Sequence, residues 1–104
     1  MSSLIYHITT AGQWKTARAI GSFEAPSLAA EGFIHCSTLP QVAGVLQRYY
    51  QGQQNLLLLT IDTEKLLRSP VYEMAPSVNE EFPHIYGPIN LSAVIKVSEV
   101  ELQP

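Results

Sequence analysis

The run NLLLLTID, Asn55–Asp62, constrains the fold more than any other stretch of this chain. Its apolar residues are continuous instead of alternating with polar ones, and a polar residue bounds it at each end. This pattern is typical of a β-strand that the rest of the molecule covers on both faces. We therefore expect the run to form the central strand of a sheet.

Helix signals precede this strand. Thr10 and Gln13 have the spacing of a capping box, and Gly21 is placed to end the helix that they begin. The apolar face of this helix comprises Trp14, Ala17 and Ile20. Pro26 then opens a single helical turn, SLAAE, which Gly32 closes as a residue with positive φ.

The clearest helix begins at Thr38. Gln41 follows three residues later, Pro40 is tolerated in the first turn, and Gly52 stops the helix. Its apolar face comprises Val42, Val45, Leu46, Tyr49 and Tyr50. We expect this face to pack on the sheet.

Short strands complete the pattern. They are expected at Leu4–Ile8, Gly32–Ser37, Pro70–Met74 and Ala93–Leu102, with a turn of helix at Thr63–Leu67. Strands and helices do not alternate strictly enough for a doubly wound sheet, so an α+β fold is predicted, with helices packed on a mixed or antiparallel sheet. The 104 residues show no repeat or linker and fit one domain, residues 1–104.

The composition argues against two classes of partner, nucleic acid and membranes. Nine acidic and six basic residues give a net charge of −3 without any basic run, so nucleic acid is not an expected partner. The chain has neither a signal-peptide pattern nor the roughly 20 apolar residues that span a bilayer, so no membrane partner is expected. The single cysteine, Cys36, forms no intrachain disulfide and favours the cytoplasm. A small ligand, a protein partner and self-association stay open.

The three histidines share an unusual setting, because Ile, Phe or Tyr flanks each of them in YHIT, GFIHCS and FPHIYG. Each also has a hydroxyl two residues later, on the same face of an extended strand. These pairs are His7 with Thr9, His35 with Ser37, and His84 with Tyr86. If the three segments are neighbours, their imidazoles and hydroxyls line one ligand pocket in an apolar frame.

Three interpretations of the histidines stay open. Each imidazole alone fits a core side chain bonded to a backbone carbonyl, since an unbonded one costs roughly 1–3 kcal/mol. A three-histidine zinc site is the second, although the chain lacks short HxH or HExxH spacing. A nucleotide or sugar site demands less exact geometry. Two imidazolium ions about 5 Å apart repel by roughly 3 kcal/mol at an effective dielectric near 20, so neutral rings are expected around pH 7.

The segment FPHIYGP is predicted to be stiff, because Pro83 fixes its own φ and removes a backbone donor. A stiff segment presents His84 and Tyr86 at fixed positions and so lowers the ordering cost of binding. The alternative is a rigid edge segment that fills the core with Phe82, Ile85 and Tyr86.

Four stretches together resemble one known family: YHIT, SLAAEGFIHCS before a helix, an apolar strand ending in Asp, and FPHIYGPI. Over nearly the whole chain they are similar to domain of unknown function 952, a family of bacteria and plants. That family is similar in fold to ADP-ribosyltransferases, in which a first-strand histidine hydrogen-bonds a ribose of NAD. The resemblance implies an ADP-ribosyltransferase-like architecture and chemistry on NAD or a related nucleotide.

The resemblance also implies roles for individual residues. His7 with Thr9 resembles the ribose-binding histidine, although Ile8 stands where the transferases have glycine. His35 and Ser37 resemble the second-strand element on the nicotinamide side of the cleft. The FPHIYG stretch resembles nothing in the transferases and is identified with the family itself.

Transferases place a catalytic glutamate on a late strand, and Glu99 with Glu101 has the Glu-x-Glu spacing of arginine-directed enzymes. A terminal edge strand also carries acidic residues on its solvated side, so both interpretations stay open. Glu31 and Glu73 are the other acidic candidates. Glu31 is expected to hold its turn by bonding a backbone N–H or the Ser27 hydroxyl.

The resulting hypothesis is a cleft for a small ligand, with NAD as a candidate substrate and no metal assigned. The catalytic candidates are His35 and His84, and the ligand-binding candidates are His7, Thr9, Ser37 and Tyr86. Whether catalysis occurs stays open. The alternatives are a non-catalytic module that uses the same cleft and the three-histidine metal site.

Overall fold

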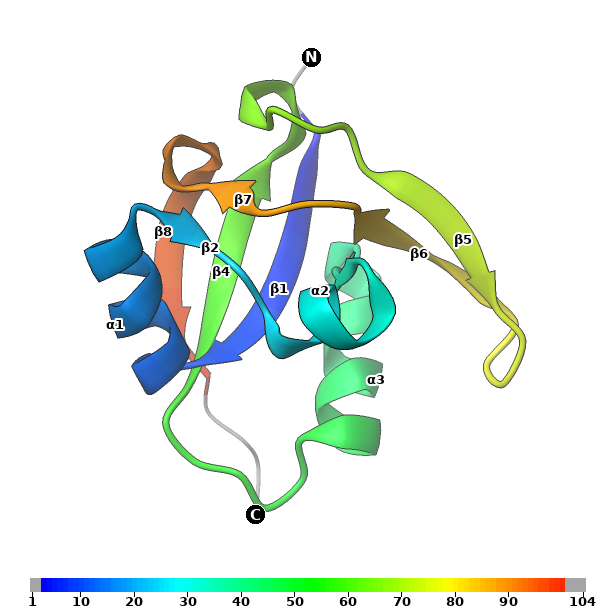
Figure 1. The fold of residues 1–104 in the computed structure, drawn as a ribbon. Coiled ribbons are helices and arrows are strands. Elements are labelled where there is room, and N and C mark those ends of the chain that lie inside the picture. The colour runs from blue at the N-terminus through cyan, green and yellow to red at the C-terminus, as the bar shows by residue number, and fades with distance from the viewer. Residues whose placement is uncertain (1–2, 101–104) are drawn as a thin grey trace.

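The predicted central strand lies in the middle of a three-stranded antiparallel sheet, in a computed structural model that describes residues 3–100 (Figure 1). Strand β4 (Leu56–Asp62) pairs with β1 (Leu4–Thr10) on one side and with β8 (Val94–Glu99) on the other. The β1–β4 pairing is regular, whereas the β4–β8 pairing shifts register between Thr60 and Ile61. The prediction of a central strand is confirmed.

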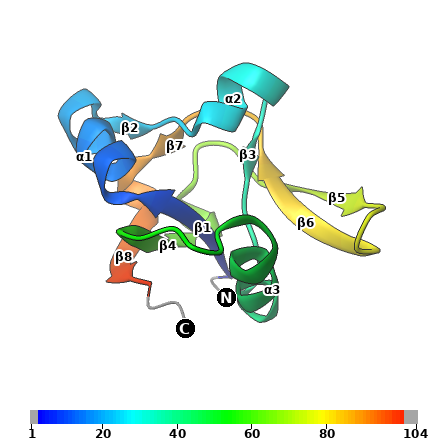
Figure 2. The same cartoon turned by 90° about the horizontal axis from the view of Figure 1, so that it is seen from below.

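Helices cover both faces of this sheet. Helix α1 (Ala11–Ile20) lies on one face and α3 (Leu39–Tyr49) lies on the other (Figure 2). The core on the α1 face includes Ile5, Ala17, Phe23, Leu59 and Ile61. The core on the α3 face comprises Tyr6, Ile8, Val42 and Leu56. Because β4 contributes to both cores, its apolar residues do not alternate with polar ones.

Helix α1 begins and ends where its sequence signals predict. The Thr10 hydroxyl accepts a hydrogen bond from the Gln13 backbone N–H at 3.1 Å. Gly21, with a φ of +99°, donates its own N–H into the last turn, a conformation that glycine adopts without strain. The prediction that Ile20 faces the core is wrong, since its side chain is 64% exposed. Phe23, which follows the turn, fills the core instead.

Gln41 ties helix α3 to a neighbouring strand. The Thr38 backbone N–H donates to Gln41 Oε1 at 2.9 Å, as the predicted capping box requires. Gln41 Nε2 also donates to the Glu81 carbonyl at 2.8 Å. Val42 is buried, but Tyr49, which was predicted on the same face, is 61% exposed because it lines an open pocket instead.

A second antiparallel sheet has the order β3–β6–β5. Strand β3 (Ile34–His35) is shorter than predicted, and β5 (Val71–Ala75) forms a hairpin with β6 (Glu80–Ile85). The hairpin extends away from the rest of the molecule (Figure 1). A two-stranded sheet of β2 (Ser22–Phe23) and β7 (Ile89–Asn90) was not predicted from the sequence.

Pro83 lies in the middle strand of this second sheet, which corrects the interpretation of its segment as an edge. The Cys36 N–H donates to the Pro83 carbonyl at 2.9 Å, but proline has no N–H to return the bond. The β3–β6 pairing therefore ends here. The next residue, Ser37, exchanges two backbone hydrogen bonds with Tyr6 of β1, at 2.8 and 2.7 Å. The segment 34–37 thus joins the two sheets.

The remaining elements are short. Helix α2 (Pro26–Glu31) ends at Gly32, whose φ is +89°, as predicted. Two turns of 3-10 helix, η1 (Thr63–Lys65) and η2 (Leu91–Ala93), flank β4 and β8. All strand pairs in residues 3–100 are antiparallel, so the predicted α+β class is confirmed. No helix in this part of the chain is both long and apolar enough to cross a membrane.

Candidate functional site

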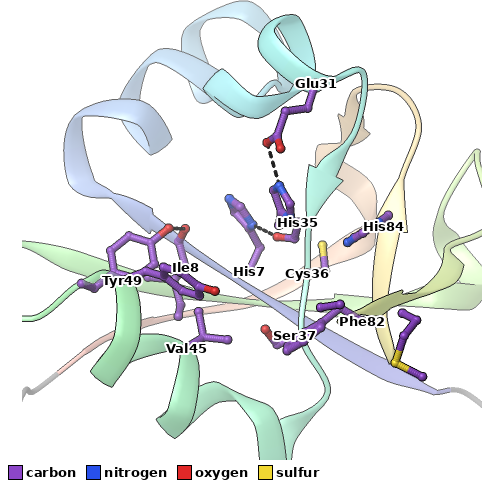
Figure 3. Close-up of a pocket in the computed structure, with 13 residues that line it drawn as sticks. His7, Ile8, Glu31, His35, Cys36, Ser37, Val45, Tyr49, Phe82 and His84 are labelled. Carbon is purple, nitrogen blue, oxygen red and sulfur yellow. Dashed lines mark hydrogen bonds and ion pairs between the residues drawn. The ribbon is translucent and has the colours of Figure 1, made fainter. Parts of the chain in front are cut away.

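A pocket of about 480 Å³ lies where the two sheets meet, and all three histidines line it (Figure 3). His7 comes from β1, His35 from β3 and His84 from β6. These strands come together because the segment 34–37 pairs first with β6 and then with β1. The volume falls within the range of small-molecule sites.

His7 is held by one ring nitrogen and open at the other. Its side chain is buried, with its ring edge-on to Phe23 at 5.1 Å between centroids. Nδ1 donates to the His35 carbonyl at 2.6 Å. Burial lowers the pKa of His7 to about 4, although the bond to His35 acts in the opposite direction. Nε2 has no hydrogen-bond partner within residues 3–100. Every fully buried side-chain nitrogen or oxygen in those residues does have a partner, so Nε2 is not fully buried and is an exposed acceptor.

His35 is paired with Glu31, the last residue of α2. His35 Nε2 lies 2.8 Å from Glu31 Oε2, and each side chain is half exposed. The expectation that Glu31 bonds a backbone N–H or the Ser27 hydroxyl is wrong, because its carboxylate turns toward the imidazole instead (Figure 3). With Nε2 donating to this carboxylate, Nδ1 is the ring nitrogen left for a ligand.

His84 is paired with Glu73 across the β5–β6 hairpin. His84 Nδ1 lies 2.8 Å from Glu73 Oε1, and the Tyr86 hydroxyl donates to the same oxygen. The Tyr86 hydroxyl and then His84 hold the pKa of the Glu73 carboxyl below its usual range. The same bond raises the pKa of Tyr86. With Nδ1 donating to this carboxylate, His84 keeps Nε2 as its free nitrogen.

Phe33 packs against both of these histidines. Its ring stacks on His84 at 4.2 Å and meets His35 at 4.8 Å between centroids. The rings of His35 and His84 are 5.0 Å apart and nearly perpendicular. Phe33 and the two carboxylates thus fix the imidazole orientations before any ligand is present, which is the preorganisation that small sites require.

The six predicted site residues do not all reach the pocket. The three histidines and Ser37 line it, but Thr9 and Tyr86 are not lining residues. Thr9 shares the His7 face of β1, yet it is fully covered and its hydroxyl donates to Gln13 Oε1 at 2.7 Å. Tyr86 connects to the pocket through the Glu73–His84 pair and through its ring contact with Phe33, at 5.3 Å between centroids.

The rest of the lining is apolar and aromatic, with one acidic side chain. Tyr49, Tyr50 and Phe82 contribute aromatic rings, and Met74 contributes a thioether. Among residues 3–100, no Lys or Arg lines the pocket, and Glu31 is the only carboxylate that does. Cys36 also lines the pocket, but burial raises the pKa of its thiol, so a thiolate is not available there.

Of the glutamate pair suggested by the resemblance, the structure describes only Glu99. Glu99 is exposed on β8 and is absent from the lining, and Glu101 lies outside the described residues. The three-histidine metal interpretation also lacks support in the geometry. Within residues 3–100, no group of three or more His, Cys, Asp or Glu side chains is placed to hold a metal ion.

Sequence reasoning named Glu31 and Glu73 as acidic candidates but did not pair them with the histidines. Glu31 and His35 are four residues apart, which is a helical spacing, but Gly32 ends the helix between them. That spacing could have suggested the pair. Glu73 and His84 meet only through the register of β5 with β6, in which Val71 lies opposite His84, and no local pattern reveals it.

The fold and the site define a small α+β domain with a histidine-lined pocket. The chain belongs to the family described as "Protein of unknown function (DUF952)", which it matches over residues 8–97. The resemblance to domain of unknown function 952 is therefore confirmed. No curated protein matches the chain.

The chain is also similar to solved structures of protein CC0527 from Caulobacter crescentus. The crystal structure is 33% identical, with a TM-score of 0.88, over 97% of this chain and 89% of that chain. The crystal structure of a double mutant is 32% identical, with a TM-score of 0.87 over the same shares. The solution structure is 32% identical, with a TM-score of 0.77, over 96% of this chain and 86% of that one.

Proposed function

We propose that this protein binds a small molecule in the histidine-lined pocket, and that the ligand is NAD or a related nucleotide bound through a nucleoside part. One observation carries the proposal. Imidazoles from three different strands line one pocket, and each has one ring nitrogen bonded to a protein oxygen and the other nitrogen free. Ribose hydroxyls and amide N–H groups are the donors that such nitrogens accept from.

His7 is the proposed ribose contact. Its Nε2 is a fixed acceptor, because Nδ1 is bound to the His35 carbonyl and the ring is neutral at pH 7. We propose with it an ADP-ribosyltransferase-like architecture, in which a first-strand histidine bonds a ribose. Ser37 lines the pocket beside it and is proposed to orient the sugar.

His35 and His84 are the proposed groups for proton transfer in any ADP-ribosyl-type chemistry. Each has a carboxylate oxygen 2.8 Å from one ring nitrogen, which orients the ring. A non-catalytic binding module with the same pocket is the second candidate. The place of Glu99, exposed on β8 and outside the lining, favours this second candidate.

Calorimetric titration of NAD and of ADP-ribose into the wild-type protein and His7→Asn tests the proposal. Asparagine keeps a donor near the position of Nδ1 and removes Nε2, so saturable binding is expected to be lost in this variant. Gln53→Ala, which changes an exposed side chain outside the pocket, is the matched control. Absence of binding to the wild-type protein would contradict the proposal. Release of free nicotinamide from bound NAD then separates an enzyme from a binding module.

A further inference from the structure

We infer that the pocket selects its ligand by charge: it takes a nucleoside that is uncharged or carries an amino group, and it gains nothing from phosphate. This inference rests on the proposed function and names the ligand class within it. A dinucleotide such as NAD would place its phosphates outside the pocket. It would therefore bind no more tightly than its nucleoside part.

The hydrogen-bonding capacity of the pocket is the first argument. His7 donates from Nδ1, His35 from Nε2 and His84 from Nδ1, each to a protein oxygen. In its neutral form each imidazole has its other nitrogen as an acceptor, so three neutral rings would present three acceptors to a ligand. A ligand with hydroxyl, amino or ammonium groups satisfies them. Phosphate oxygens are acceptors and leave all three unpaired.

The charge around the pocket is the second argument. Glu31 and Glu73 each lie 2.8 Å from a lining imidazole, and no Lys or Arg in the described part of the chain lines the pocket. The Arg48 guanidinium lies 5.7 Å from the centre of the Tyr49 ring but is itself outside the lining. The carboxylates therefore attract a cationic group and repel a phosphate.

The rest of the pocket suits the base of a nucleoside. Tyr49, Tyr50 and Phe82 supply aromatic surface, and Met74 adds a polarisable thioether. Aromatic side chains stack on nucleobases of any kind, because every base has a π-face. The imidazoles would thus bind the sugar edge while the apolar wall covers the base.

A matched series of three adenosine derivatives tests the inference, because they differ in charge at one position only. The probes are 5′-amino-5′-deoxyadenosine, adenosine and adenosine 5′-monophosphate, titrated calorimetrically into the wild-type protein at pH 7. We expect the amino compound to bind most tightly and the monophosphate to bind least tightly, with about a fivefold change in Kd at each step, the size of a partly screened charge interaction.

Glu31→Gln provides the matched variant, since glutamine can still bond His35 but carries no charge. We expect it to reduce the preference for the amino compound over the monophosphate. Glu99→Gln, which removes the same charge on exposed β8, is expected to leave that preference unchanged.

The two proposals fail in different ways. Equal affinities for the three probes, or tighter binding of the monophosphate, would overturn the charge inference and leave the proposed function standing. Binding of NAD without binding of adenosine would also overturn the charge inference and leave the proposed function standing. If neither NAD nor any of the three probes binds, both proposals are wrong.

Discussion

His7 differs from an ordinary core histidine because one of its ring nitrogens stays unbonded at the wall of a pocket. Its ring is buried against Phe23 and anchored to the His35 carbonyl, so the direction of Nε2 is fixed by packing. Because Nε2 is exposed at the pocket wall and is not fully buried, it can accept a hydrogen bond from a ligand.

The depressed pKa of His7 predicts an acid-dependent loss of stability. Between its ordinary value of 6.5 and its folded value of about 4, the unfolded chain binds a proton that the folded protein does not. The free energy of unfolding therefore falls as the pH falls through this window, by about 3 kcal/mol in total, and does not change through His7 above it. Urea unfolding at several pH values measures this loss.

His7→Asn is the control for this prediction, since the carboxyl groups of the protein lose stabilisation in acid as well. The variant is expected to show a smaller loss between pH 6.5 and 4 than the wild-type protein. An identical pH dependence in both proteins would contradict the assigned state of His7.

Glu73 should control the ionisation of Tyr86. The Tyr86 hydroxyl donates to the Glu73 carboxylate, and this bond raises the pKa of Tyr86. Glu73→Gln removes the negative charge, so the pKa of Tyr86 is expected to fall toward its ordinary value. Tyrosine ring resonances followed by NMR in an alkaline titration measure the change, with Glu99→Gln as the control. No difference between the two variants would contradict the Glu73–Tyr86 contact.

At the residue scale, the sequence indicated the histidines but not their partners. The apolar flanks of His7 correctly suggested a covered imidazole, and its burial agrees. The partner of His84 could not be predicted, because Glu73 is eleven residues away and meets it through strand register. Thr9 was misplaced because alternation gives the face of a strand but not what covers that face.

At the element scale, Pro83 decides how the two sheets connect. It accepts a hydrogen bond from Cys36 but returns none, so the chain leaves β6 and pairs with β1 at the next residue. The same proline was interpreted as a stiffening residue, which is a local property. Its effect on sheet pairing depends on a partner strand that local sequence does not identify.

Gln41 is predicted to stabilise the protein through two elements at once. It accepts the Thr38 N–H at the start of α3 and donates to the Glu81 carbonyl of β6. Gln41→Ala is expected to lower the free energy of unfolding by about 1–2 kcal/mol. Gln53→Ala, whose exposed side chain makes one long hydrogen bond, should cost less than about 0.5 kcal/mol. If urea unfolding shows that Gln41→Ala and Gln53→Ala lower the free energy of unfolding equally, the link that Gln41 makes between α3 and β6 does not stabilise the protein.

The ends of the helices were predicted best from the sequence. Thr10, Gly21, Gly32 and Gln41 act as their residue types indicate, because capping is satisfied within a few residues. The two-residue strands β2 and β7 were missed, since so short a strand has no periodicity to detect.

At the scale of the whole molecule, the pocket exists because two sheets share one segment. The central strand and the α+β class follow from local patterns, but the position of the pocket follows from long-range pairing. His35 lies opposite His84 through only two paired residues of β3 and β6, and His7 joins them through β1. The sequence therefore predicted three imidazoles of similar setting without establishing their proximity.

The most direct test of the account is an imidazole ¹⁵N NMR spectrum of the protein, recorded near pH 7 with and without adenosine. The structure predicts a proton on Nδ1 of His7, on Nε2 of His35 and on Nδ1 of His84, which leaves three acceptor nitrogens. Adenosine is expected to shift all three acceptor signals together and saturably. Protons on the opposite nitrogens, or a titration in which the three signals do not respond, would contradict a shared acceptor-lined pocket.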